Sequence, residues 1–130
     1  MLAERIRKAK RVYIIGNGGS YANAMHMAND LISCGVKAYT IDPSTLTAIA
    51  NDYGYELSFS RWISTFGESG DLLIALSGSG KSRNILNAIE TAKSLGMEVE
   101  TVFGAPQLDM QSAEEYQILL GHELMRELRK

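Results

Sequence analysis

Short runs of apolar residues alternate along the chain with segments in which apolar residues recur every three or four positions. The apolar runs predict strands over Arg11–Ile15, Val36–Ile41, Asp71–Ser77 and Met97–Phe103. Strands that alternate with helices indicate a parallel sheet with helices on both faces. We therefore expect an α/β fold, a three-layer αβα sandwich whose parallel sheet has four or five strands in the flavodoxin-like order 2-1-3-4.

The segments between the strands predict the helices. Helical spacing covers Leu2–Lys10, Tyr21–Ser33, Leu57–Phe66, the segment from Ser82 to Leu95, and a last helix that reaches about Leu128. Ser112 and Glu115 form a capping-box pattern that predicts the start of the last helix. A short helix is expected from Ser44 or Thr45 to Ala50, followed by a turn at Asn51–Gly54. The side chains predicted to point inward are Phe59, Trp62, Ile63 and Phe66, and on the last helix Tyr116, Leu119, Leu120, Leu124 and Leu128.

Two of the predicted strands end in loops of small residues. Gly16–Ser20 follows the first strand and Ser77–Ser82 follows the third. In the expected strand order these strands are neighbours, and ligands of open α/β sheets bind at the carboxyl edge of the strands. Backbone N–H groups and the positive ends of the following helices would meet there, an arrangement that suits a phosphate group. The sequence therefore predicts a phosphate site between the two loops.

Three other interpretations of the loops stay open at this point. Gly80-Lys81-Ser82 matches the end of a nucleotide-binding P-loop, but Ala75 stands where that motif requires glycine. The first loop lacks the third glycine of a dinucleotide-binding motif, because Tyr21 occupies that position. Both loops could also be simple tight turns, although their shared content of serine and glycine favours a ligand.

Composition and charge narrow the classes of function. The chain has 130 residues, of which 45% are hydrophobic, and this length predicts a single domain over 1–130. A net charge of −2 gives no electrostatic case for binding nucleic acid or a membrane surface. No apolar run approaches the ~20 residues of a membrane span, and Met1–Lys10 is not followed by the apolar stretch of a secretory signal. The single cysteine, Cys34, suits a reducing compartment, so a cytoplasmic protein is expected.

Six short motifs follow one another along the chain: Gly16–Ser20, Ala24–His26, Asn51–Gly54, Phe59–Arg61, Gly70-Asp71 and Ser77–Ser82. Their order resembles that of sugar isomerase (SIS) domains, and most closely that of the phosphoheptose isomerase branch. The resemblance covers Val12–Val102 and resumes at Glu114–Leu128. It implies an enzyme that interconverts sedoheptulose 7-phosphate and a heptose 7-phosphate. The alternative is a non-catalytic SIS module that binds a sugar phosphate as a regulatory or protein-interaction subunit.

The resemblance also implies roles for individual residues. Aldose–ketose isomerisation needs a base and an acid, and the resemblance gives these roles to Asp30 and His122. It further implies a metal, zinc in many members, held by His26, Asp30, Glu114 and His122. Helical spacing brings Glu115 closer to His122, whereas the motif register selects Glu114. The residues expected to bind the phosphate or the sugar are Asn17, Gly18, Gly19, Ser20, Asn51, Asp52, Ser77, Ser79 and Ser82.

The chain also departs from the family pattern. Asp30 replaces the family's Glu, and its carboxylate retreats by roughly 1.5 Å, the length of one C–C bond. A misplacement of about 1 Å can cost a hundredfold in rate. The segment before the last helix is shorter than in the family, and the family's long N-terminal helix is absent. Because the family's sites lie at subunit interfaces, we expect a homo-oligomer, a dimer or a tetramer, with sites near these interfaces.

Overall fold

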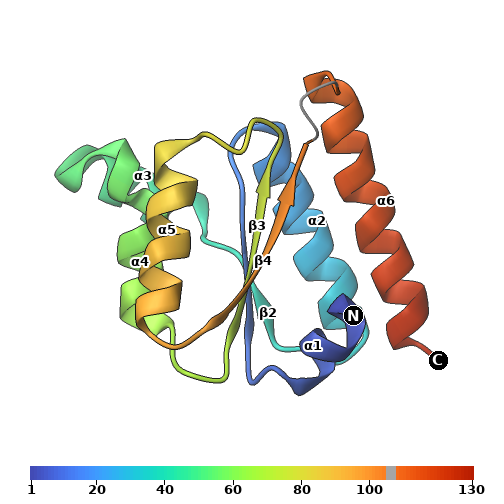
Figure 1. Ribbon diagram of the computed structural model, residues 1–130. Coiled ribbons are helices and arrows are strands. Elements are labelled where there is room, and N and C mark those ends of the chain that lie inside the picture. The colour runs from blue at the N-terminus through green and yellow to red at the C-terminus, as the bar shows by residue number, and fades with distance from the viewer. Residues whose placement is uncertain (105–107) are drawn as a thin grey trace.

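The computed structural model describes residues 1–104 and 108–130 and contains a parallel sheet between two layers of helices (Figure 1). The order of the strands is β2-β1-β3-β4, which confirms the predicted α/β class and strand order. All six residues of β3 are buried, as expected for a central parallel strand covered on both faces. The strands are β1 Val12–Ile15, β2 Ala38–Tyr39, β3 Leu72–Ser77 and β4 Glu98–Phe103.

Two apolar cores lie on opposite faces of the sheet. Ile14 and Ile74 point to the face covered by the first group of helices, and Ile15 and Leu73 point to the other face. Neighbouring positions of a strand point to opposite faces, so β1 and β3 supply both cores. The helices of the first face are α1 Leu2–Lys8, α2 Gly19–Ser33 and α6 Met110–Leu128; those of the second are α4 Ser58–Phe66 and α5 Arg83–Ser94.

Helix α3, Pro43–Tyr53, differs from the prediction at both ends. Asp42 caps it, because the Thr45 N–H donates to Asp42 Oδ1 at 3.0 Å. Hydrogen bonds from the backbone and side chain of Thr45 also lower the pKa of the Asp42 carboxyl. The helix then runs through the predicted turn and ends only at Gly54, whose φ of 108° favours glycine. The predicted turn at Asn51–Gly54 is therefore wrong except for its last residue.

Helix α6 begins earlier than expected and is rotated about its axis. Its cap is Asp109, whose Oδ1 accepts a hydrogen bond from the Ser112 N–H at 2.7 Å, so the predicted capping box is wrong. Tyr116 and Leu119, expected to point inward, are 54% and 60% exposed. Phe66, at the end of α4, is also exposed. The buried residues of α6 are Ala113, Gln117, Gly121 and Leu124.

Three further features complete the fold. The 3-10 helix Tyr55–Leu57 joins α3 to α4. The described residues contain four strands, and positions 105–107, in the segment where a fifth strand was considered, lie outside the description. Within the same described residues, no helix is long and apolar enough to cross a lipid bilayer.

The burial of β3 leads to a test of stability. Leu73 is fully buried, whereas Leu86 on α5 is 39% exposed. We expect Leu73→Ala to lower the free energy of unfolding by about 2–5 kcal/mol because it leaves a cavity in the core. The same change at Leu86 should cost at most about 1 kcal/mol, since less apolar area is lost. Urea unfolding followed by circular dichroism measures both, and equal losses would contradict this account of the core.

Candidate functional site

The two loops of small residues lie side by side at the carboxyl edge of the sheet. β1 pairs with β3 in register from Val12 with Leu72 to Ile15 with Ala75, so the loops that follow emerge next to each other. Together they line a pocket with a volume of about 80 Å³, which suits a group of the size of a phosphate. The lining residues are Asn17, Ser20, Leu76, Ser77, Gly78, Ser79, Ser82, Met110 and Glu114.

Glycines allow the first loop to turn tightly into α2. A Cβ at Gly16 would lie 2.6 Å from the backbone C and O atoms of Ser20. Gly18 precedes the helix with a φ of 55°, and Gly19 is the first residue of α2. In the second loop the Ser77 hydroxyl accepts a hydrogen bond from the Gly80 N–H at 3.0 Å. The N-termini of α2 and α5 thus follow the loops directly, and their positive ends favour an anion there.

Asn17 is held by a network that the sequence did not reveal. Its side-chain amide exchanges two hydrogen bonds of 2.9 Å with the amide of Asn84. The Tyr55 hydroxyl donates to Asn17 Oδ1 at 2.6 Å, and Asn84 also donates to Ser58 Oγ at 3.2 Å. Asn84 is buried in the first turn of α5, and a polar residue at that position was the only sequence signal for it. These contacts fix the first loop against the second layer of helices.

A second buried network ties α2 to α6 beside the pocket. Asn23 Nδ2 donates to the Glu114 carbonyl oxygen at 3.0 Å and to Gln117 Oε1 at 2.8 Å. Gln117 Nε2 donates to Ser20 Oγ at 3.0 Å. Three polar side chains are therefore buried and satisfied between the two helices, and leaving any of them unpaired would be costly. The network fixes α6 at the edge of the pocket.

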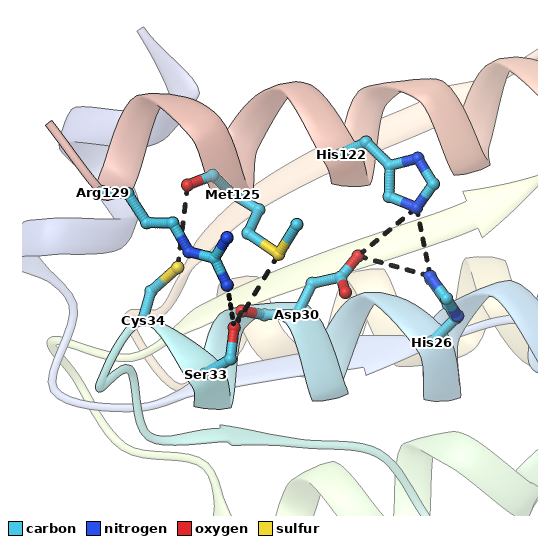
Figure 2. A network of polar contacts seen from close by, with 7 residues as sticks. All are labelled: His26, Asp30, Ser33, Cys34, His122, Met125 and Arg129. Atoms are coloured by element: carbon cyan, nitrogen blue, oxygen red, sulfur yellow. Dashed lines mark hydrogen bonds and ion pairs between the residues drawn. The ribbon is translucent and has the colours of Figure 1, made fainter.

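His26 and Asp30 from α2 meet His122 from α6 (Figure 2). The two Nε2 atoms of the histidines are 3.2 Å apart, and Asp30 Oδ2 lies 3.5 Å from His26 Nε2 and 4.0 Å from His122 Nε2. The Asp30 side chain is 14% exposed, whereas that of His26 is 54% exposed. Gly121 of α6 lies against Met27 of α2, and a Cβ built on Gly121 would meet Met27 at an ordinary 3.6 Å. Ser33, Cys34, Met125 and Arg129 link the same helices further along.

The arrangement of these three residues fits a divalent metal ion. Two imidazole nitrogens and a carboxylate oxygen are a donor set that zinc takes. With zinc–ligand distances near 2.0–2.1 Å, tetrahedral ligand atoms lie about 3.3 Å apart, close to the separations of 3.2, 3.5 and 4.0 Å seen here. Asp30 Oδ2 is buried and has no hydrogen-bond partner, which a metal or a proton would satisfy.

The structure places Glu114, the predicted fourth metal ligand, away from the two histidines and Asp30. Within the described residues the cluster contains only His26, Asp30 and His122. The Glu114 carboxylate lies against Gly19 in the pocket between the loops, and Glu115 is exposed. The structure therefore brings neither glutamate to the histidines.

Asn51 and Asp52 also lie apart from the other predicted site residues. Both are exposed in the last turn of α3, where Asn51 Nδ2 donates to Asp52 Oδ1 at 3.1 Å. Neither lines the pocket, and neither belongs to the cluster of histidines and aspartate. Their predicted contact with the substrate stays a prediction.

Comparison with known proteins yields consistent matches. A family model described as SIS domain matches residues 1–104. A phosphoheptose isomerase from Campylobacter concisus is 45% identical over 76% of this chain and 57% of its own length. One from Pectobacterium atrosepticum is 38% identical over 94% of this chain and 67% of its own length. The solved structure of a phosphoheptose isomerase from Neisseria gonorrhoeae has a TM-score of 0.91 at 28% identity, covering 98% of this chain and 80% of that chain. The chain thus spans less than two thirds of the Campylobacter relative and about two thirds of the Pectobacterium one.

The tight first loop leads to a test with two glycines. At Gly16 a methyl group would overlap the backbone of Ser20, whereas at Gly121 it would meet Met27 at an ordinary 3.6 Å. We expect Gly16→Ala to lower the free energy of unfolding by about 1–3 kcal/mol through overpacking. Gly121→Ala should leave it unchanged or raise it by up to about 1 kcal/mol, because alanine favours a helix. Denaturant titration measures the free energy of unfolding of both variants. If Gly16→Ala did not lower it, the close approach of Gly16 to Ser20 would be wrong.

Proposed function

Because the chain belongs to the SIS domain family and, within it, to the phosphoheptose isomerases, we propose that it interconverts sedoheptulose 7-phosphate and a heptose 7-phosphate. The phosphate occupies the pocket between the loops, where Ser77, Ser79 and Ser82 supply hydroxyl groups. The carbonyl end of the open-chain sugar lies at Asp30 and His122. The reaction moves a hydrogen between two neighbouring carbons, which requires a base and an acid.

The separation between the pocket and the cluster is the observation that carries this proposal. Ser20 lines the pocket, and His26 follows it by six residues on the same helix. At about 1.5 Å per residue, His26 lies about 9 Å from Ser20 along α2 and Asp30, four residues further on, about 15 Å, so the cluster lies between these limits. Each bond of an extended carbon chain advances about 1.3 Å, given a C–C bond of about 1.5 Å. An open-chain heptose with a terminal phosphate thus spans about 10 Å, and a triose phosphate would be too short to reach both ends.

Asp30 and His122 divide the proton transfers between them. The Asp30 carboxylate takes the proton from C1 of the ketose, and the electron pair left behind forms an enediol. His122 gives a proton to the oxygen on C2 from Nδ1, the ring nitrogen that a metal bound at Nε2 would leave free. Return of the proton from Asp30 to C2, and transfer of the proton on the C1 oxygen to His122, complete the aldose.

Zinc is the metal that we propose for the cluster, held by His26, Asp30 and His122. When bound, it supplies a positive charge that polarises the sugar carbonyl. A carboxylate has two oxygens, so Asp30 can hold a metal with one and accept a proton with the other. The support for this role is the unpaired Asp30 Oδ2 between the two imidazoles.

The proposal includes a homo-oligomer, a dimer or a tetramer. Helices α2 and α6, which carry the cluster, also expose Met25, Ile32, Ile118 and Leu119. Large apolar side chains that are exposed on both helices favour a contact with another protein surface there. A second copy against these helices would shield His26 from water, and exclusion of water strengthens electrostatic interactions in a site.

Isomerase activity is tested by incubating the protein with sedoheptulose 7-phosphate in deuterated water, with and without zinc. We expect NMR to show an aldose 7-phosphate and deuterium on the carbons that exchange. Asp30→Asn removes the base and should lower kcat about 100-fold or more. Asp42→Asn is the matched control, because asparagine caps a helix as well as aspartate does. Turnover no higher than that of Ser79→Ala in either condition would reject the isomerase and favour the non-catalytic module.

Metal binding is tested separately by zinc titration in a calorimeter. Loss of a residue next to a metal ligand typically costs 10–100-fold in affinity. We therefore expect His26→Gln and His122→Gln each to weaken binding by about 100-fold or more. Glu115→Gln, exposed on the same helix, should leave the affinity nearly unchanged. If Glu114→Gln weakened binding as much as the histidine variants, Glu114 would belong to the ligand set after all.

A further inference from the structure

The pocket between the loops already contains a negative group of the protein itself. The carboxylate of Glu114 reaches from α6 to the first residue of α2. A Cβ built on Gly19 would lie 2.3–2.5 Å from the carboxylate carbon and both of its oxygens. The carboxylate thus lies next to the Cα atom of Gly19, at the positive N-terminal end of α2. Glu114 lines the pocket together with the serines.

Hydrogen bonds fix the backbone of Glu114 at the edge of the pocket. Its carbonyl oxygen accepts a hydrogen bond from Asn23 at 3.0 Å, and Asn23 is in turn bound to Gln117. Asp109 fixes the start of the same helix by accepting from the Ser112 N–H at 2.7 Å. Only the side chain of Glu114 can therefore move out of the pocket without breaking buried contacts.

The charge of Glu114 is not balanced in the pocket. Among the described residues that line it, Glu114 is the only charged side chain; the others are small, apolar or amide and hydroxyl groups. Lys81 and Arg83 flank the second loop but are exposed and do not line the pocket. A phosphate group that enters the ~80 Å³ space would meet a carboxylate at short range, and like charges at such distances repel.

We infer that Glu114 is an internal competitor for the phosphate: its carboxylate occupies the anion site in the free protein and must leave before a phosphate binds. The inference rests on the proposed function, because it concerns the same phosphate site. Glu114 would therefore lower the affinity of the protein for the phosphorylated end of the substrate.

The test compares inorganic phosphate binding by the wild-type protein, Glu114→Gln and Glu115→Gln. The two variants make the same chemical change at adjacent positions of α6, but Glu115 is exposed and lies outside the pocket lining. Titration followed by the amide NMR signals of Gly18, Gly19 and Ser79 gives the dissociation constant at fixed ionic strength. We expect Glu114→Gln to bind phosphate at least about tenfold more tightly, and Glu115→Gln to change the affinity less than about threefold. Glu114→Ala, which also removes the charge, should bind more tightly too.

The outcomes separate this inference from the proposed function. Equal or weaker phosphate binding by Glu114→Gln and Glu114→Ala would overturn the competitor role. If Ser79→Ala still abolished binding, the phosphate site itself would stand. If no form of the protein bound phosphate at these amides, both the competitor role and the phosphate site would be wrong. The melting temperature of each variant, measured first, shows that any change in affinity belongs to a folded protein.

Discussion

The packing of α2 against α6 is the interaction on which the candidate site depends. Helix α2 starts at the pocket between the two loops and carries His26 and Asp30, and α6 carries Glu114 and His122. Buried hydrogen bonds through Asn23 and Gln117 fix the register of the two helices at one end. A small residue, Gly121, lies where they approach near the cluster. A shift of one helix along the other would break these bonds and separate Asp30 from His122.

The parallel sheet supplies the second constraint. The pairing of β1 with β3 sets the two loops next to each other, whatever the details of their side chains. Helix α2 then leads from the pocket between the loops to His26 and Asp30 with a fixed rise per residue, so the secondary structure itself sets the distance between the pocket and the cluster.

The sequence predicted what depends on local pattern and strand order. Apolar runs and small-residue loops were enough to predict the sheet order and the convergence of the loops, and the spacing of His26 and Asp30 places them on one face of α2.

The sequence did not predict the features that depend on tertiary contacts. Tyr116 and Leu119 fit an inward apolar stripe, but α6 turns instead to place Gln117 and Gly121 against α2. The same rotation, which no local pattern reveals, sets the Glu114 carboxylate in the pocket between the loops. Asp42 and Asp109 took the capping roles predicted for residues two or three positions later, because aspartate is an equally good cap.

The most direct test of the account is a crystal structure of the protein with sedoheptulose 7-phosphate bound. The account predicts the phosphate between Gly16–Ser20 and Ser77–Ser82, with the Glu114 carboxylate displaced from Gly19. It also predicts C1 and C2 of the open-chain sugar within about 3–4 Å of the Asp30 carboxylate and the His122 ring. A phosphate bound elsewhere, or a sugar whose carbonyl end points away from α2 and α6, would contradict it.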